Sequence, residues 1–487
     1  MKQFINSNTS ILLLLGSVTL LFLSQFITNT FYAYGLTVLL AALAFYRPTV
    51  GIAFLFIYFP YRSLMLEFNP SLKLIGDLII LAMALRVAWN SRKHITTLLR
   101  FELFEFAFLG FIAVGSISAF LTGVTTAAIV FQVRAFLIMF LLFYVVRRLN
   151  LTKKDYLFFG YVIILSLTPI VIQGYVEKLS LRSAFMPEAW INKALSNTNK
   201  VRVYGVLNNP NTLAMYLICS GIVTALVRHF TSHKWIRNLL SFILLVTAGL
   251  FILTFSRGSF IFLAILIVLF SLLQKNFKMI LKTGIGFVLA FALFAFPTIQ
   301  LASWIESNTQ VGSFERTDTS ELRPLETDRL KETFSSDTLA LSSNSGRLYI
   351  VKTGFEIFRD YPIIGSGFGT FGDSATKSYQ SPIYKDYGIY LPIYSDNQYI
   401  QIIAQTGVLG VLLFAVFLLA MSYRVFRFSS TSMYVHLAIA SIIGVMAVGL
   451  LYNIWENKTF TLFFFVFLGI LFNFYKPITT NKPTKAL

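Results

Sequence analysis

The chain has 487 residues, of which 56% are hydrophobic and only 13% are charged. A water-soluble domain usually has about a quarter of its residues charged. This composition therefore excludes a water-soluble protein and indicates an integral membrane protein. The excess of 40 basic over 21 acidic residues would suggest a nucleic-acid partner in a soluble chain. In a membrane protein basic residues mark the cytoplasmic loops instead, so no nucleic acid is expected. The single Cys219 provides neither an intramolecular disulfide nor a cysteine-only metal site.

Long apolar runs recur along the chain and are separated by short polar breaks. They do not alternate polar and apolar residues as the strands of a membrane β-barrel do. They therefore predict an all-α fold, a polytopic bundle of about 12 to 14 transmembrane helices. The predicted spans lie near 10–27, 31–46, 49–61, 73–89, 103–122, 128–146, 156–174, 207–227, 238–254, 258–274, 283–301, 400–421, 433–452 and 459–475.

Basic residues cluster in every second loop, and roughly half of the chain's basic residues then fall on one side of the membrane. By the positive-inside rule this side is the cytoplasm. The protein is therefore expected in the cell (inner, cytoplasmic) membrane, with both termini on the cytoplasmic side. The clusters are Arg92-Lys93-Arg100, Arg147-Arg148-Lys153-Lys154, Arg228-Lys234-Arg237, Lys275-Lys278-Lys282, Arg424-Arg427 and Lys476-Lys482-Lys485.

The spans and the two long loops divide the chain into six parts. These are N-terminal transmembrane helices in 1–174, an outer loop at 175–206, central helices in 207–301, a large extracytoplasmic loop at 302–399, C-terminal helices in 400–475 and a cytoplasmic tail at 476–487. In the large loop, the polar stretch Asn308 to Ser345 is expected to form a flap, and Arg347 to Arg359 has the spacing of an amphipathic helix.

Polar residues gather at the outer ends of the predicted helices. Asn208 or Asn209 can cap the helix that begins at Pro210, and its free N–H groups could bind an anion; the alternative is an ordinary capped helix. Arg257 is confined between two apolar runs, where an arginine is usually paired or functional. Arg134 lies in the outer part of the bilayer, ~20 Å along its helix from the cytoplasmic end, with Asp77 as its expected counter-ion, and that pair could be purely structural.

Asp396 precedes the span near residue 400. It is either the N-cap of that helix or a carboxylate that accepts a proton from a sugar hydroxyl. Arginines at 202, 257, 347 and 134 suit a phosphate or diphosphate, because a guanidinium pairs bidentately with phosphate oxygens. The sequence offers no His/Cys metal set and no P-loop, so an enzyme without metal or cofactor that acts on an anionic lipid carrier is expected.

Five motifs follow one another in the second half of the chain. They are R-x-x-G-x-x-x-N-P-N-x-L-A from Arg202, T-x-S-R-G from Thr254, G-R-L from Gly346, Y-P-I-I-G-S-G-F-G-x-F from Tyr361 and D-N-Q-Y-I-Q-x-x-x-x-x-G-x-x-G from Asp396. In this order and with this topology, the region of about 200 to 425 resembles the superfamily of O-antigen ligases and Wzy-type polymerases.

The resemblance implies an inverting, metal-independent glycosyl transfer at the outer leaflet, from an undecaprenyl-diphosphate-linked glycan to a sugar hydroxyl. It implies that Arg202 and Arg347 bind the donor's diphosphate, with Arg257 in the family's S-R-G turn. Further candidate substrate-binding residues within the motifs are Tyr204, Asn208, Asn211, Asn397 and Gln401. Membrane lipid and a chain-length regulator are the other expected partners.

The sequence departs from the ligases at one position. Where the ligases usually read H-N-x-Y-L-Q, with the histidine as the proposed base or acceptor-orienting group, this chain has Asp396. The departure favours a polymerase of a cell-surface polysaccharide. The alternatives are a ligase that transfers glycan to lipid A core or protein, and a flippase of lipid-linked oligosaccharides, for which charges along a central path would be needed.

Overall fold

The computed structural model describes residues 2–27, 29–195, 197–309, 346–428 and 431–475, and within these ranges it contains helices, turns and loops but no strand. The all-α prediction is confirmed. The helices are α1 (Lys2–Leu23), α2 (Thr30–Tyr46), α3 (Pro48–Phe68), α4 (Ile75–Asn90), α5 (Ile95–Leu98), α6 (Leu103–Leu121), α7 (Thr126–Arg148), α8 (Lys153–Leu179), α9 (Glu188–Ile191), α10 (Asn197–Lys200), α11 (Pro210–Phe230), α12 (Lys234–Leu253), α13 (Arg257–Leu273), α14 (Lys278–Ala290), α15 (Phe296–Asn308), α18 (Arg347–Asp360), α19 (Gln398–Phe426), α20 (Met433–Val448) and α21 (Lys458–Tyr475).

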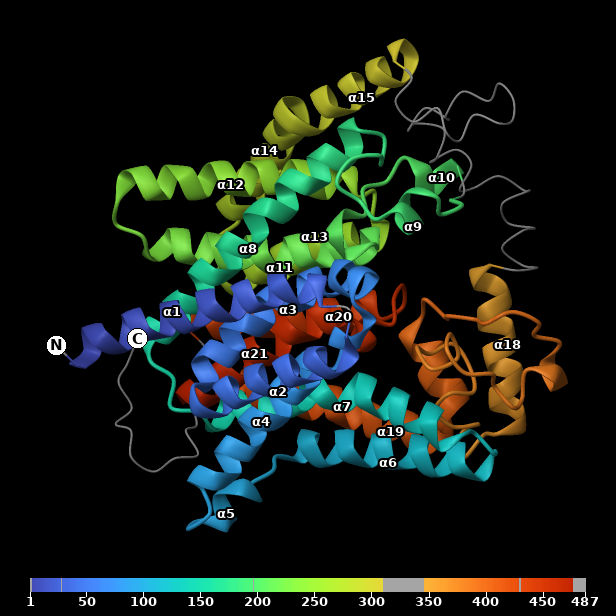
Figure 1. The fold of residues 1–487 in the computed structure, drawn as a ribbon. Helices are drawn as coiled ribbons and strands as arrows, with labels where there is room; N and C mark the ends of the chain where they lie inside the picture. The colour runs from blue at the N-terminus through green and yellow to red at the C-terminus, as the bar shows by residue number, and fades with distance from the viewer. Residues whose placement is uncertain (1, 28, 196, 310–345, 429–430, 476–487) are drawn as a thin grey trace.

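The long helices run side by side and form a bundle (Figure 1). In the described part of the chain, ten helices are long and apolar enough to cross a membrane, α14 and α15 counting as one because a π-helical turn joins them. Three shorter apolar helices, α2, α13 and α20, accompany them. The remaining predicted span, near 73–89, corresponds to α4. The protein is therefore an integral membrane protein with a polytopic helix bundle.

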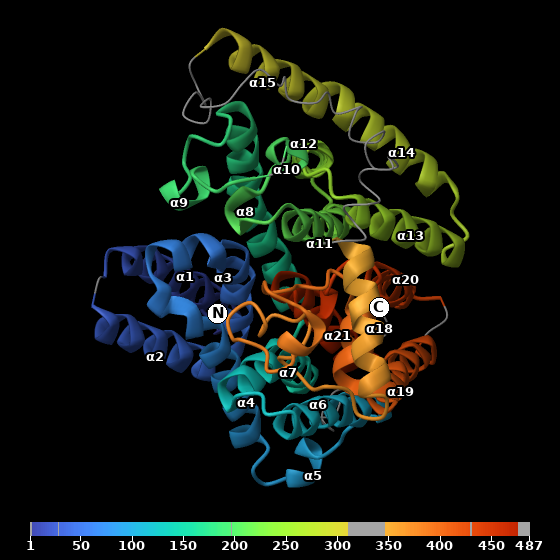
Figure 2. The same cartoon turned by 90° about the vertical axis from the view of Figure 1, so that its right-hand side faces the viewer.

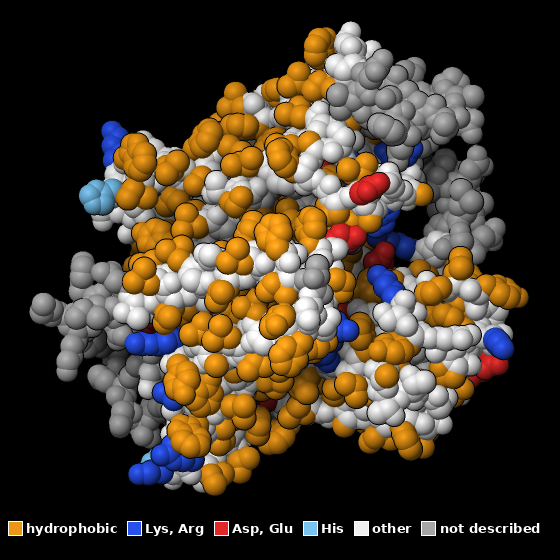
Figure 3. Space-filling model, in the orientation of Figure 1, with side chains coloured by type: hydrophobic (Ala, Val, Ile, Leu, Met, Phe, Trp, Pro, Cys, Tyr) orange, Lys and Arg blue, Asp and Glu red, His pale blue; other side chains and the backbone are white. Residues whose placement is uncertain are grey.

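The bundle has two different ends, which we call the basic end and the loop end. The basic end carries the clustered Lys and Arg residues between the helices, on the left in Figure 3, and the N-terminal end of α1 lies there (Figure 1). Arg147 is buried at this end and pairs with Glu102 at 2.9 Å and Glu105 at 2.7 Å. Arg424 at the end of α19 joins Glu102 at 3.3 Å. These ion pairs tie α6, α7 and α19 together.

Aromatic side chains fill the core between α6, α7, α19 and α21. The ring of Phe108 lies 4.5 Å from that of Phe140 and 4.7 Å from that of Phe417, measured between centroids. Phe111 packs in turn on Phe368, a loop residue, at 5.6 Å. Burial of such large rings drives helix packing and fixes where the loop meets the bundle.

The loop end faces the viewer in Figure 2 and carries α9, α10 and α18. The amphipathic helix predicted over Arg347 to Arg359 is confirmed as α18, which buries Thr353, Gly354 and Ile357 against the segment that follows it. Of the predicted flap, positions 310–345 lie outside the described residues, as do those of the predicted tail.

Glycines allow the segment after α18 to pack closely against α6 and α19. Gly365, Gly367 and Gly369 have φ of 72°, 97° and 77°, a region that side chains with a Cβ rarely adopt. Their turns bring the N–H of Ser366 to the carbonyl of Ala404 at 2.9 Å and the N–H of Gly367 to that of Gln405 at 2.8 Å. The glycine motif is therefore a packing device that positions the residues around 373–396.

Candidate functional site

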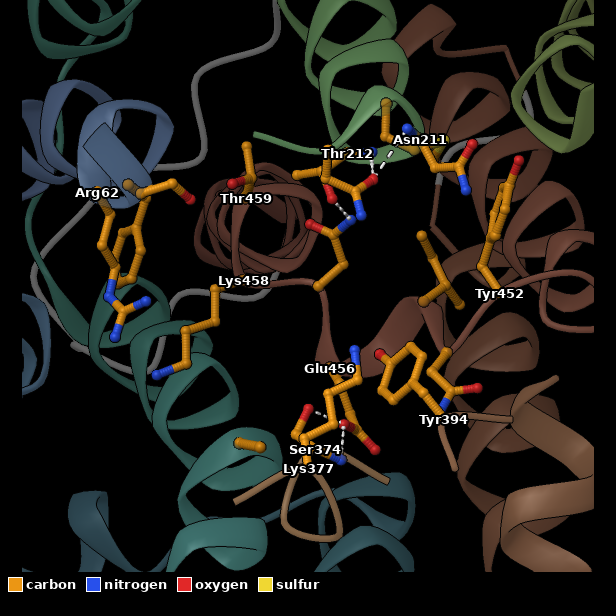
Figure 4. A pocket seen from close by; sticks show the side chains of 18 of the residues that line it. Arg62, Asn211, Thr212, Ser374, Lys377, Tyr394, Tyr452, Glu456, Lys458 and Thr459 are labelled. Atoms are coloured by element: carbon orange, nitrogen blue, oxygen red, sulfur yellow. Dashed lines mark hydrogen bonds between the residues drawn. The ribbon is translucent and has the colours of Figure 1, made fainter. Parts of the chain in front are cut away.

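A pocket of about 510 Å³ opens among the helix ends and loops of the loop end. It is built by α3, α7, the start of α11, the segment between α18 and α19, and the link between α20 and α21 (Figure 4). Its charged and aromatic lining includes Arg62, Lys73, Arg134, Lys377, Lys458, Asp396, Glu456, Tyr394 and Tyr452. Such a mixture of cations, carboxylates and aromatic rings suits a sugar that carries phosphate.

The asparagine turn before α11 positions one wall of the pocket. Asn209 is the N-cap, because its side chain accepts the N–H groups of Asn211 and Thr212 at 2.9 and 3.0 Å. Of the two asparagines that could cap, Asn208 instead adopts a left-handed backbone with φ of 52° and does not line the pocket. Asn209, Asn211 and Thr212 all line it.

Arg202 lies behind this wall and joins two of the sequence motifs. Its Nε donates to the carbonyl of Thr254 at 2.9 Å, and an Nη donates to Asn211 Oδ1 at 2.5 Å. The same Asn211 oxygen accepts the hydroxyl of Ser256 at 3.1 Å, and that hydroxyl lies 3.0 Å from the hydroxyl of Tyr452. The N-P-N and S-R-G turns therefore meet at Asn211, beside the pocket.

Asp396 lines the pocket where the loop enters α19. It is not the N-cap of that helix: Asn397 accepts the N–H groups of Tyr399 and Ile400 at 3.1 and 3.2 Å. The alternative that Asp396 serves as the cap is therefore wrong. Both residues are of a type that caps helices, and the backbone decides between them, because Asp396 has a left-handed φ of 45° that leaves the cap position to its neighbour.

Three cations act on the carboxylate of Asp396. Burial raises the pKa of Asp396, and Arg347, Lys377 and Arg202 oppose that rise, in decreasing order. Arg347 begins α18 and Arg202 precedes α11, so both outer loops contribute an arginine to this Asp396 cluster, which we define as Asp396, Arg347, Lys377 and Arg202. The predicted arginines Arg202 and Arg347 therefore both act electrostatically on the predicted catalytic carboxylate, and neither lines the pocket itself.

Glu456 is a pocket residue that the sequence analysis missed. It lies in the link between α20 and α21, and its carboxylate accepts Gln132 Nε2 at 2.7 Å, Gln401 Nε2 at 2.5 Å and the N–H of Ser374 at 2.9 Å. Burial first and the nearby Asp373 second raise the pKa of Glu456 to about 7. The sequence did contain a feature that could have identified it: two charged residues, Glu456 and Lys458, stand close together between two apolar spans, on the same side of the membrane as the large loop.

Arg134 belongs to a different group of charges. It pairs with Asp77, as its depth in the span predicted, and Lys458 Nζ lies 3.7 Å from the other oxygen of that carboxylate. Arg62 is the third cation that acts on this group. We call Asp77, Arg134, Lys458 and Arg62 the Asp77 cluster. In Figure 4, Arg62 and Lys458 lie on one side of the pocket and Tyr394 and Tyr452 on the other.

The remaining predicted site residues do not line the pocket. Arg257 is exposed at the start of α13, and its neighbour Ser256 is the residue that reaches Tyr452. Tyr204 is buried beneath the guanidinium of Arg182, which lies 4.2 Å from its ring centroid. Gln401 is buried behind the pocket and acts on it through Glu456.

The fold and this pocket define an all-helical, polytopic membrane protein with a charged site at one end of the bundle. Residues 213–415 match the family model described as O-antigen ligase. That stretch runs from α11 into α19 and contains Arg257, Arg347 and Asp396, and the match confirms the resemblance of this part of the chain to the O-antigen ligase-related superfamily. No curated protein matches the chain.

Proposed function

We propose that the protein is a polymerase of a cell-surface polysaccharide. It transfers glycan from undecaprenyl diphosphate to a sugar hydroxyl of another lipid-linked repeat, at the outer face of the cytoplasmic membrane. The O-antigen ligase match supports the broader role in glycan transfer. The Asp396 cluster supports the finer proposal, because an arginine from each outer loop acts on a carboxylate that lines the pocket.

The proposed chemistry needs a base and a site for a departing diphosphate. Asp396 accepts the proton of the acceptor hydroxyl while that oxygen attacks the anomeric carbon opposite the diphosphate. The bond from that carbon to the diphosphate oxygen breaks, and the diphosphate leaves with the electron pair. Arg202 and Arg347 stabilise its growing charge, and a raised pKa makes Asp396 a stronger base. The anomeric configuration is inverted.

Other carboxylates of the large loop are less suitable as the base. Glu356 is half exposed on α18, Asp360 accepts the hydroxyl of Tyr387, and Asp373 is buried, where it accepts backbone N–H groups. Among the described residues, the acidic side chains that line the pocket are Asp396 and Glu456. Glu456 is therefore the second candidate base, in place of the three loop carboxylates.

A ligase remains the alternative that a specific observation favours, since the matching family is described as O-antigen ligase. Asp396 at the position of the ligases' histidine supports the polymerase instead. The charged lining gathers at the loop end, whereas a flippase needs charges along a path through the bundle. The clustered basic residues support a cytoplasmic location for the basic end and for both termini.

Purified protein supplied with lipid-linked repeats alone tests the proposal. We expect a ladder of products that differ by one repeat, of broad length distribution in the absence of a chain-length regulator. Gel or mass analysis of the extracted lipids reports it. Glycan transfer that begins only after lipid A core is added, with no ladder from repeats alone, would establish the ligase instead.

A further inference from the structure

Two separate groups of cations act on charged residues that line the pocket. The cations that act on Asp396 are Arg347, Lys377 and Arg202. The charges that act on Lys458 are Asp77, Arg134 and Arg62. The two sets share no member, and Arg62, Arg134 and Lys458 line the same pocket as Asp396. A single diphosphate at the Asp396 cluster therefore leaves the Asp77 cluster unused.

The Asp77 cluster has more positive than negative charge. The Asp77 carboxylate forms an ion pair with Arg134, and one of its oxygens lies 3.7 Å from Lys458 Nζ. Among the described residues no carboxylate lies within ion-pair distance of Arg62. Lys73, which also lines the pocket, adds a further cation on this side. Surplus positive charge next to a bilayer is unfavourable unless a ligand neutralises it, so the cluster is suited to bind an anion.

Uncharged groups line the pocket together with the cations. Tyr394 and Tyr452 present rings, and Asn211 and Asn457 present amides to the pocket. Rings and amides are what a sugar residue needs for stacking and for hydrogen bonds to its hydroxyls. The pocket therefore offers sugar-binding groups beside its cations, and the two tyrosines lie across the pocket from Arg62 and Lys458 (Figure 4).

We propose that the Asp77 cluster is a second anion site, which binds a lipid-borne phosphate while the donor's diphosphate occupies the Asp396 cluster. Two guanidinium groups and an ammonium suit phosphate oxygens. Two lipids carry this chemistry at the outer leaflet, the diphosphate of the acceptor repeat and the head group of an anionic phospholipid. The choice of the acceptor rests on the proposed function; the anion site itself does not.

Binding of inorganic pyrophosphate to the purified full-length protein tests the site without any transfer reaction. Equilibrium dialysis with labelled pyrophosphate should find two sites in the wild type. Arg62→Gln should weaken one of them at least tenfold, and Arg347→Gln should weaken the other. Lys73→Gln, at an exposed position, provides a milder second variant. Arg359→Gln and Lys385→Gln remove exposed cations of the loop end that do not line the pocket, and both should bind like the wild type.

The proposal is overturned if Arg62→Gln and Lys73→Gln both leave pyrophosphate binding unchanged, or if the wild type has one site or none. A loss of the same size in the two control variants would also overturn it, since it would reflect nonspecific attraction.

Competition identifies the lipid. If the occupant is a phospholipid, nanodiscs containing phosphatidylglycerol should displace the Arg62-dependent pyrophosphate, relative to phosphatidylcholine nanodiscs. If the occupant is the acceptor, they should not displace it, and Arg62→Gln should raise KM for the acceptor repeat without changing KM for the donor. If the polymerase proposal fails and no transfer occurs, the dialysis result still decides whether the anion site exists.

Discussion

Asp396 is held in an unfavourable backbone conformation by its neighbours. The N–H of Ser395 donates to the carbonyl of Gly372 at 2.9 Å, and its hydroxyl donates to Asn453 Oδ1 at 2.7 Å. On the other side, Asn397 is fixed as the cap of α19. A left-handed non-glycine residue costs about 1 to 3 kcal/mol and persists where the surrounding structure over-determines it, often at functional sites. The arrangement fixes the backbone from which the carboxylate projects.

The pH dependence of transfer should report the ionisation of Asp396. The base must be ionised, so the rate should fall as the pH decreases through the pKa of Asp396, which burial raises. Arg347→Gln removes a cation that lowers this pKa, so the pKa should rise further and the acid limb of kcat/KM should move to higher pH. Rates measured over the acid range for wild type and variant check this, with Arg359→Gln as control.

An acid limb that stays in place, or moves to lower pH, would contradict this role for Arg347 and Asp396. A wild-type limb near pH 7 that disappears in Glu456→Gln would assign the base to Glu456, whose pKa is about 7.

Single residues could be predicted where depth or motif constrains them. The depth of Arg134 in its span was enough to pair it with Asp77. The cap of α19 could not be assigned, since Asp396 and Asn397 are adjacent and both types cap; the φ angle that separates them depends on tertiary contacts. Glu456 was missed because its short link looked like a simple break between two apolar spans.

At the scale of elements, α19 combines a polar stripe with a break. Gln398, Gln401 and Gln405 are buried on one face, and Gln401 and Gln405 connect Glu456 to Asp373 through hydrogen bonds of 2.5, 3.3 and 2.7 Å. The helix is interrupted at Gly407, where φ is 57° and ψ is −163°.

The bounds of these elements could be predicted, but their internal contacts could not. The apolar run was sufficient to locate the span near 400–421. The interruption at Gly407 could not be predicted, because it does not change the length or the hydropathy of the run. The break depends on the segment after α18, whose Pro362 and Ile363 carbonyls accept the N–H groups of Val408 and Leu409 at 2.9 and 3.0 Å. Non-helical backbone is tolerated inside a span only where such partners exist.

At the scale of the whole molecule, the basic residues at one end both indicate the orientation of the protein in the membrane and stabilise the packing of its helices. Arg147 and Arg148 were counted as topology signals, yet they are only 3% and 7% exposed. Arg147 pairs with two glutamates, and Arg148 donates to the carbonyls of Arg100 and Leu98. A count of charges cannot separate orientation from packing, since both place arginines at the same helix ends.

The orientation itself can be measured with single cysteines in a Cys219→Ala background. Ser183 is exposed at the loop end, and Ser232 is exposed in the loop between α11 and α12 at the basic end. Because the basic end is expected inside, an impermeant thiol reagent applied to intact cells should label Ser183→Cys and not Ser232→Cys. After permeabilisation both should react. The opposite pattern would place the pocket in the cytoplasm and exclude transfer at the outer face.

The most direct test of the account is transfer from purified lipid-linked repeats by Asp396→Asn. Asparagine has almost the same size and tolerates a left-handed backbone, so the pocket should keep its shape while the proton acceptor is lost. Asp386→Asn, an exposed position of the same segment outside the pocket, is the matched control. We expect Asp386→Asn to act like the wild type and Asp396→Asn to be slower by roughly 10² to 10⁴-fold. Activity of Asp396→Asn within a few-fold of the wild type would contradict the assignment of Asp396 as the base.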